Sequence, residues 1–274
     1  MTITDQILKP GEFYTSKFPK DKIFIHHTAG SHRPDWSIHG WNTDKTKSGR
    51  QRTTATAFVI GGISTSNGNV DFDGKIYRAF NEDYWAVHLN GEELYHLDKT
   101  SIGIELCNYG PLTRAADEKY YNYVNKPVLA NQVVTLSKSF RGYKYYHRYS
   151  DKQIESLRQL LALLAGRYSI NLKKGLKEWI AKEQLTMPSG LSVKQQQTWL
   201  KTNGFVGRDG EVITNDGVKG ANTDWALSTI GKSAFEFNYQ SIKGAPGLWT
   251  HTNVRIDKTD CSPQPHLLEM IKSF

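Results

Sequence analysis

Residues 23–30, with the sequence IFIHHTAG, constrain the fold of this chain more than any other stretch. A short run of β-branched and aromatic residues is followed at once by two histidines, a threonine and an Ala-Gly turn. This pattern predicts a buried strand that carries polar side chains to its open end. A strand end suits a metal ligand, because the sheet fixes the imidazole and the adjoining loop leaves room for substrate. His26 is therefore a candidate ligand that needs partners elsewhere in the chain.

The candidate partner ligands lie near the C-terminus. His251 ends a short apolar run, and Lys258 and Asp260 follow it within the length of one loop. Two neutral imidazoles and one carboxylate, with a fourth position open for water, form the ligand set of a catalytic zinc ion. Residue types alone leave this hypothesis open, because isolated histidines are more often structural or exposed.

Residues 101–107 (SIGIELC) carry the clearest strand pattern in the chain. With the two-residue period of a strand, the apolar residues at 102, 104 and 106 face one side, and Glu105 faces the other. A carboxylate within an apolar strand is unfavourable unless it is paired or used. Glu105 is therefore a candidate functional residue.

Taken together, IFIHHTAG, SIGIEL and HTNVRIDKTDCSP (251–263) resemble the zinc-dependent type-2 N-acetylmuramoyl-L-alanine amidases. That family includes phage endolysins, bacterial wall-recycling amidases and the peptidoglycan recognition proteins of animals. The likeness covers most of residues 20–173 and 246–272, in the family's order. It implies an α/β fold with a central mixed β-sheet flanked by helices, and a catalytic domain made of residues 1–173 and 246–274.

The resemblance also implies a reaction, the hydrolysis of the amide between N-acetylmuramic acid and the L-alanine of the stem peptide. The implied cofactor is Zn²⁺, held by His26, His251 and Asp260. Glu105 is expected to take a proton from the attacking water and pass it to the leaving amine. Lys258 is expected to stabilise the oxyanion of the tetrahedral intermediate.

Further residues are expected near the substrate. Trp85 and His88 stand where the family places an aromatic residue and a histidine along the groove, and Thr28 directly follows the two histidines of residues 23–30. The alternative for His88 is a loop histidine whose hydrogen bonds go to the backbone. We expect Thr28, Trp85 and His88 to bind substrate.

The chain departs from the family pattern at two positions. Some phage relatives place a tyrosine where this chain has Thr56, so proton transfer is expected to fall to Glu105. Cys261 replaces the usual proline after the metal-binding aspartate, and a thiolate is itself a zinc ligand. The family spacing of Lys-x-Asp or Lys-x-Cys favours Asp260 as the ligand, and His27 is expected to point into the loop.

Two other functions compete with the amidase hypothesis. One is a peptidoglycan-binding protein without catalysis, as many recognition proteins of this family are. The other is a zinc peptidase that cuts within the stem peptide. The complete ligand set favours an enzyme over a binding protein.

Charge and composition bear on the partner and the compartment. The net charge of +8 favours an anionic polymer, which by charge alone could be nucleic acid or bacterial wall. The resemblance implies peptidoglycan and no nucleic acid, and we expect a monomer. The N-terminus lacks a signal-peptide pattern, the two cysteines form no disulfide framework, and no stretch could span a bilayer. We therefore expect synthesis in a host cytoplasm, no membrane insertion, and action on the wall after release, as for a phage endolysin.

The remaining elements follow from local patterns. We expect a polar arm over 1–21, a basic loop over 45–52, strands over 55–60, 75–80 and 248–251, and helices over 34–41, 150–168 and 265–274. Residues 108–149 receive no assignment.

Residues 174–245 interrupt the family pattern, and we expect them to form a mainly helical insertion. Helices over 192–200 and 222–230 flank an Asp-Gly turn at 216–220, an order that resembles a peptidoglycan-binding repeat. The insertion is therefore either a small wall-binding module or a helical support for the sheet.

Overall fold

The computed structural model describes residues 1–45 and 53–274. Most of the predicted basic loop (45–52) lies outside these residues. The strands are β1 (Ile3–Asp5), β2 (Lys22–His27), β3 (Phe58–Ile60), β4 (Ile76–Arg78), β5 (Ser101–Leu106), β6 (Pro111–Arg114), β7 (Tyr120–Tyr121), β8 (Pro127–Val128), β9 (Val133–Phe140), β10 (Tyr143–His147) and β11 (Gly247–Thr250). The helices are α1 (Pro34–Trp41), α2 (Tyr95–Thr100), α3 (Asp151–Tyr168), α4 (Leu176–Lys182), α5 (Val193–Thr202), α6 (Ala221–Thr229), α7 (Tyr239–Ile242) and α8 (Pro265–Lys272).

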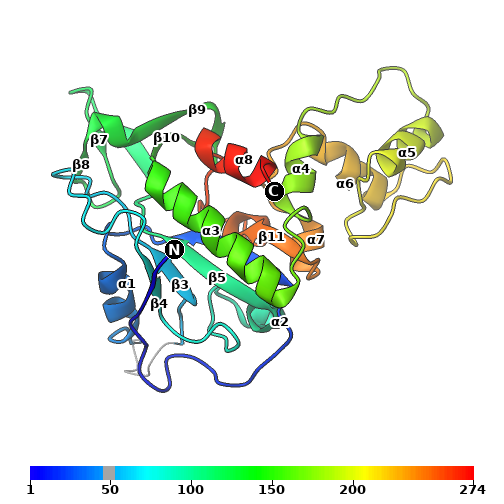
Figure 1. Cartoon of the computed structure of the whole chain (residues 1–274). Helices are drawn as coiled ribbons and strands as arrows, with labels where there is room; N and C mark the ends of the chain where they lie inside the picture. Colours follow the sequence, from blue (N-terminus) through cyan, green and yellow to red (C-terminus); the bar gives the residue numbers. More distant parts are fainter. Residues whose placement is uncertain (46–52) are drawn as a thin grey trace.

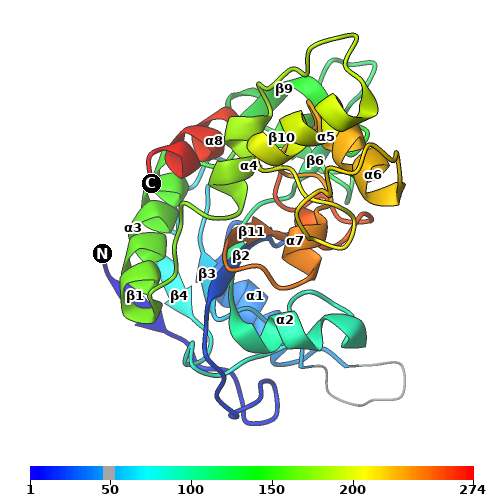
Figure 2. The ribbon, with the colours of Figure 1, turned by 90° about the vertical axis from the view of Figure 1, so that its right-hand side faces the viewer.

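The central layer is a six-stranded mixed sheet in the order β1-β4-β3-β5-β2-β11. β3, β5, β2 and β11 run parallel to one another, whereas β4 is antiparallel to β3, and β1 runs parallel to β4. The carboxyl ends of the four parallel strands therefore meet at one edge of the sheet. Helices lie on both faces, with α3 and α8 on one side and α1, α2 and α7 on the other (Figures 1 and 2). The predicted α/β fold with a central mixed sheet is confirmed.

α3 is the longest helix, and it covers one face of the sheet (Figure 2). It buries a stripe of apolar residues at three- and four-residue spacing, as predicted: Ile154, Leu157, Leu160, Leu161 and Leu164. Its first turn is closed by a capping box in which Ser150 accepts a hydrogen bond from the Gln153 N–H at 3.0 Å. The Gln153 side chain accepts in return from the Ser150 N–H at 3.1 Å.

Replacing Ser150 with alanine is expected to lower the free energy of unfolding by about 1 kcal/mol, because the first turn loses its N-cap acceptor. Urea unfolding followed by circular dichroism measures this change. Lys152→Ala, an exposed substitution in the same turn, is the matched control and should change stability by less than about 0.5 kcal/mol. Equal effects of the two substitutions would show that the capping box does not stabilise the fold.

Residues 111–147 form a second sheet that the sequence patterns do not predict. Its five strands are antiparallel, in the order β8-β7-β6-β10-β9. β9 buries only Leu136 and Phe140 among its eight residues. The apolar alternation that reveals a strand in sequence is therefore absent, because few side chains of this sheet are buried.

Three predictions at the edge of the central sheet need correction. The polar arm over 1–21 contains β1, which pairs in parallel with β4 and is joined to it by the ion pair between Asp5 and Arg78. The strands predicted over 55–60 and 75–80 are shorter, because β3 and β4 pair with each other over three residues only.

In the described part of the chain, no helix has the length and apolar character needed to cross a membrane.

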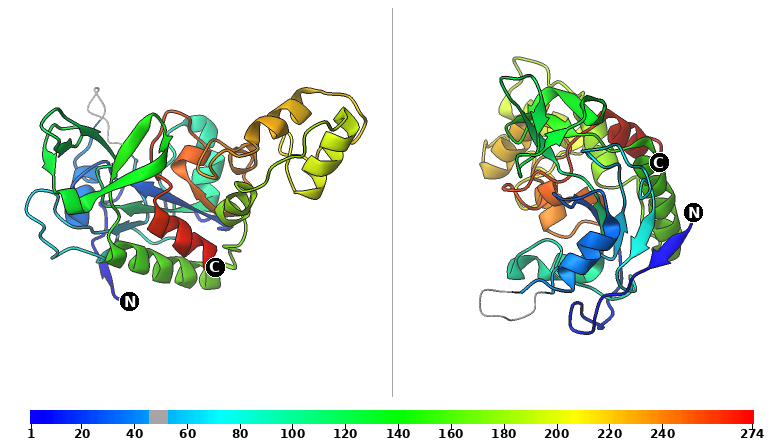
Figure 3. Two further views of the ribbon diagram at one scale, coloured as in Figure 1. Left: turned by 90° about the horizontal axis from the view of Figure 1, so that it is seen from above. Right: turned by 90° about the vertical axis from the view of Figure 1, so that its left-hand side faces the viewer.

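The segment 174–245 begins against the central sheet and then leaves it. α4 packs against α8 and β11, and Gly175 forms a bridge with Leu248. α5 and α6 lie further out and project from the rest of the molecule (Figures 1 and 3). The predicted mainly helical character of this segment agrees with these helices.

The predicted turn between α5 and α6 is organised by one buried side chain, Gln197 of α5. Its amide group donates to Asp216 Oδ1 and to the Val218 carbonyl, each at 2.9 Å. Its carbonyl oxygen accepts from the Gly217 N–H at 2.8 Å. Gly217 has a φ of +78°, which glycine adopts without steric cost.

Candidate active site

Three strands end side by side at the candidate site. β2 and β5 pair in parallel so that His26 lies opposite Glu105. β11 pairs with β2 as far as Thr250, immediately before His251. Residues in register on neighbouring strands point to the same face of a sheet, so His26 and Glu105 share a face. The strand predicted over 248–251 stops one residue early, and His251 begins a short 3₁₀ turn.

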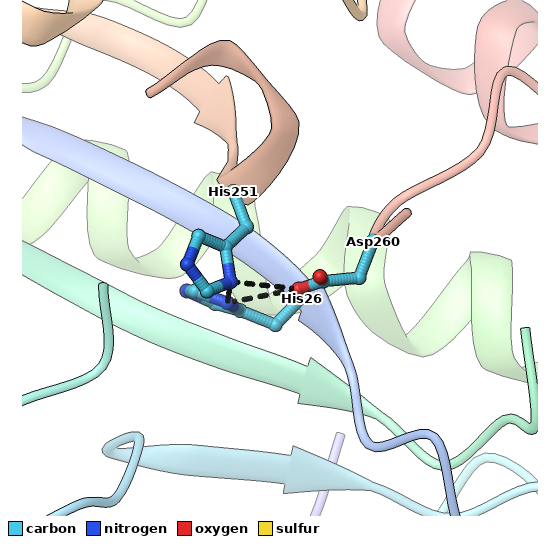
Figure 4. Close-up of side chains that lie close together, drawn as sticks. All are labelled: His26, His251 and Asp260. Atoms are coloured by element: carbon cyan, nitrogen blue, oxygen red, sulfur yellow. Dashed lines mark hydrogen bonds and ion pairs between the residues drawn. The ribbon is translucent and has the colours of Figure 1, made fainter. Parts of the chain in front are cut away.

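His26, His251 and Asp260 converge, as Figure 4 shows. The two histidine Nδ1 atoms are 3.1 Å apart. Asp260 Oδ2 lies 3.2 Å from Nδ1 of His26 and 3.1 Å from Nδ1 of His251. Both histidines are buried, and the Asp260 side chain is 13% exposed. Residues more than 200 positions apart thus present three ligand atoms to one point.

This arrangement fits a zinc ion. Zinc bonds of about 2.0–2.2 Å in a tetrahedron place the ligand atoms about 3.3–3.6 Å apart. The observed separations of 3.1–3.2 Å lie within a few tenths of an ångström of that range. Two imidazoles and a carboxylate also form a donor set that zinc accepts in catalytic sites.

The pKa shifts of His26 and Asp260 favour the protonation states that bind a metal. Burial lowers the pKa of His26 to about 4, so its imidazole is neutral at pH 7. Burial opposes the ionisation of Asp260, but the adjacent His251 and His26 outweigh it and lower the pKa of this carboxyl. Neutral imidazoles and an ionised carboxylate are the ligand forms required.

Both histidines of this cluster are also held through Nε2. Nε2 of His251 lies 3.1 Å from the Leu89 carbonyl oxygen. Nε2 of His26 lies 3.0 Å from Nδ1 of His88. In each case Nδ1 is the nitrogen that faces Asp260.

Glu105 and Lys258 are the two candidate catalytic residues: Glu105 lies opposite His26 in the sheet, and Lys258 stands two residues before Asp260. Burial raises the pKa of the Glu105 carboxyl well above its usual value, the charge of Asp260 raises it further, and that of Lys258 lowers it. Glu105 Oε2 is buried and has no hydrogen-bond partner within residues 1–45 and 53–274. A carboxyl in this position is available to a reacting group.

Three neighbouring residues face away from the ligand cluster. Cys261 is fully buried, and its thiol contacts the Tyr149 hydroxyl. His27 also turns toward Tyr149, with Nδ1 3.1 Å from the hydroxyl oxygen. Thr56 donates to the Phe58 carbonyl. Among the described residues, Asp260 therefore stands with the two histidines in the ligand cluster, and Cys261 does not.

The three residues expected to bind substrate, Thr28, Trp85 and His88, make different contacts in the structure. Trp85 is buried, donates to Ser16 Oγ at 2.9 Å and stacks on Tyr14 with 4.0 Å between ring centroids. Its ring therefore holds the N-terminal segment. Thr28 is half-buried and ties the ends of β2 and β5 together, since its Oγ1 accepts from the Asn108 N–H at 3.2 Å.

His88 lies behind His26 and is buried. Both of its ring nitrogens are engaged, Nδ1 with His26 and Nε2 with Ser101 Oγ at 2.8 Å. The alternative of a loop histidine bonded only to the backbone does not describe these contacts. Asp98 lies beside this ring, and its Oδ1 accepts from the His88 N–H at 3.0 Å. Sequence patterns reveal neither Leu89 nor Asp98, because a backbone carbonyl has no side-chain signature and Asp98 is one of many acidic residues.

One family model matches most of the central part of the chain. The family model described as N-acetylmuramoyl-L-alanine amidase matches residues 16–185, which include His26, His88 and Glu105. No curated protein matches the chain. His251, Lys258 and Asp260 lie beyond the matched residues.

Several solved structures are similar to parts of the chain. A mutant endolysin from Bacillus subtilis is 16% identical, with a TM-score of 0.37, over 62% of this chain and 79% of that one. The amidase AmiD from E. coli is 20% identical, with a TM-score of 0.36, over 69% and 59%. Drosophila peptidoglycan recognition protein SA is 15% identical, with a TM-score of 0.35, over 62% and 76%.

The family model covers more than half of the chain, from the segment before β2 to the end of α4. It spans the strands that carry His26 and Glu105. The chain therefore belongs to the N-acetylmuramoyl-L-alanine amidase family.

Proposed function

We propose that this protein is a zinc-dependent amidase that hydrolyses the bond between N-acetylmuramic acid and L-alanine in peptidoglycan. The observation that carries the proposal is the convergence of Nδ1 of His26, Nδ1 of His251 and Oδ2 of Asp260 within 3.2 Å of one another. Family membership supports the choice of bond. We further propose that the protein acts as a monomer on peptidoglycan and does not bind nucleic acid.

The chain's own residues would divide the reaction as follows. Zinc, when held by the three ligands, supplies Lewis-acid activation of water and of the scissile carbonyl. Glu105, whose buried carboxyl has a raised pKa, accepts the proton of the attacking water and returns it to the leaving amine. Lys258 stabilises the negative charge that develops on the carbonyl oxygen.

Mass spectrometry of digested peptidoglycan tests this function. Purified protein and wall fragments should release intact stem peptides that begin with L-alanine, together with glycan strands that have lost them. Peptides cut internally would instead identify a stem-peptide peptidase. Binding without any product would identify a recognition protein, and either result would overturn the amidase proposal.

We also propose that the protein serves as a phage endolysin that is made in a host cytoplasm and reaches the wall after release. Expression in a susceptible bacterium tests this role. Cells should lyse only when a membrane-permeabilising protein is expressed with it. Lysis without that second protein would contradict the release step.

The insertion offers a second proposal, that residues 174–245 are a wall-binding module. A cleft with a volume of about 790 Å³ lies between the β9–β10 hairpin, α8 and this segment. The insertion contributes Trp225, Phe237 and Lys232 to its lining, and the hairpin contributes Lys138 and Arg141. Aromatic rings and cations suit sugar rings and peptide carboxylates.

Replacing residues 188–230 with a short Gly-Ser linker is expected to weaken binding to intact walls at least about tenfold, while zinc content and cleavage of small soluble fragments persist. These boundaries spare residues 234–238, because Asn253 donates to the carbonyls of Ala234 and Glu236 beside the metal loop. Co-sedimentation with purified walls measures the affinity.

The matched control for this deletion is Asn215→Ala, an exposed substitution within the same segment. It should leave wall affinity unchanged. A folded deletion variant that binds walls as tightly as the wild-type protein would contradict the module proposal. A deletion variant that fails to fold would favour a supporting role for the insertion.

A further inference from the structure

The two metal-facing histidines are positioned by one short segment of the chain. We propose that the segment His88-Leu89, held by the buried carboxyl group of Asp98, fixes the tautomers of both His26 and His251. This proposal deepens the proposed function, on which it rests for the identity of the metal. It assigns His88, Leu89 and Asp98 as positioning residues that prepare the ligands before metal arrives.

The tautomer of His251 follows from the hydrogen bond of its Nε2 with the Leu89 carbonyl. A backbone carbonyl only accepts, so the contact of 3.1 Å between His251 Nε2 and the Leu89 oxygen requires the proton on Nε2. The lone pair of Nδ1 then faces His26 and Asp260. Leu89 thus selects the tautomer that binds a metal through Nδ1.

The tautomer of His26 depends on the ring of His88, which contacts both His26 and Ser101. Nε2 of His88 lies 2.8 Å from Ser101 Oγ and 3.5 Å from Asp98 Oδ1. The neighbouring carboxyl oxygen favours a proton on this nitrogen, which makes Nδ1 of His88 an acceptor. Nδ1 of His88 then accepts from His26 Nε2 at 3.0 Å and leaves the lone pair of His26 Nδ1 for the metal.

Asp98 holds the segment that carries both functions. Its Oδ1 accepts from the N–H groups of His88 and Leu89, each at 3.0 Å. The residue is fully buried, and its Oδ2 has no hydrogen-bond partner in the described parts of the chain. Burying a carboxyl group with one unpartnered oxygen is unfavourable for folding, so stability alone does not explain this residue.

Gly103 provides the space that the His88 ring needs. It lies opposite Phe24 on β2, two residues before Glu105 and on the same face of the sheet. A Cβ atom at this position would lie 3.1 Å from Cγ of His88 and 2.9 Å from Cγ2 of Thr56. The glycine of the SIGIEL motif therefore lets the His88 ring sit beside His26.

Long-range ¹H–¹⁵N NMR of the zinc-free protein tests the proposal directly, because it reports which nitrogen of each imidazole carries the proton. In the wild-type protein we expect both His26 and His251 to be protonated on Nε2. In His88→Leu, His26 should lose this preference while His251 keeps it, since the Leu89 carbonyl is unchanged. In Asp98→Ala, both histidines should lose it.

Zinc affinity, measured by competition with a chromophoric chelator, provides the second readout. His88→Leu and Asp98→Ala should bind zinc about 10- to 100-fold more weakly. His88→Asn and Asp98→Asn are the matched controls, because each keeps an acceptor oxygen near the original position. They should stay within about threefold of the wild-type affinity and retain its tautomers.

Two results would overturn the proposal. One is a zinc-free wild-type protein in which His26 or His251 carries its proton on Nδ1, and this result needs no variant to fold. The other is a folded His88→Leu protein with wild-type tautomers and zinc affinity. A wild-type protein that shows the expected tautomers but cleaves no peptidoglycan would refute the proposed function and leave this proposal standing.

Discussion

Alanine at His26, His251 or Asp260 is expected to remove the zinc ion and to reduce wall hydrolysis to the level of a protein-free control. Each substitution deletes one of three ligand atoms that lie 3.1–3.2 Å apart. Two remaining protein ligands cannot complete the three-ligand set of a catalytic zinc site. Metal analysis of the purified variants and a turbidity assay on bacterial walls measure the two effects.

Cys261→Ser is the matched control for this experiment. Cys261 directly follows Asp260, but its thiol is buried against Tyr149 and lies outside the ligand cluster. The serine variant should therefore keep one zinc ion per chain and most of its activity. A serine variant without zinc, beside an Asp260→Ala variant that retains it, would transfer the ligand role to the thiol.

Glu105→Gln and Lys258→Ala are expected to lower kcat by at least about a hundredfold while zinc content and folding stay intact. Glutamine keeps the shape of the side chain but cannot take up the proton that Glu105 is assigned. Alanine at Lys258 removes a charge that acts on the transition state, and loss of such a group typically lowers the rate about 100- to 1,000-fold. Steady-state kinetics on a soluble muramyl peptide gives kcat and KM separately.

Both losses should appear in kcat more than in KM, since the assigned roles belong to the transition state. Asp257→Ala is the control for Lys258. Asp257 is exposed and pairs with Arg255, so its loss should change kcat less than about threefold. Near-normal turnover in Glu105→Gln would show that the strand glutamate has a structural role only.

Local sequence patterns determined much of the central domain. The apolar run before His26, the proline at the start of α1 and the leucine stripe after Ser150 each predict an element at the right place. These signals are local, because a buried strand or an amphipathic helix repeats its apolar residues within a few positions. The second sheet has no such signal, because β6, β7 and β8 are short and the longer β9 buries only two of its eight residues.

The candidate site also combines residues that the sequence marks with an arrangement that only the fold decides. The sequence marked His26, His251 and Asp260 through their motifs, but their proximity depends on β2 and β11 being neighbours in the sheet. That pairing joins segments more than 200 residues apart, and no local pattern encodes it.

The surroundings of the ligands were decided by the tertiary structure alone. His88 and Trp85 lie in one motif, yet the first contacts His26 and the second holds the N-terminal segment. Leu89 acts through a backbone carbonyl, which every residue possesses. The sequence by itself thus marked the side chains that are candidates for metal chemistry, and the packing of β2, β5, β11 and α2 decided which atoms hold them in place. The physical reason is that hydrogen-bond partners are selected by distance in space, which the residue types do not record.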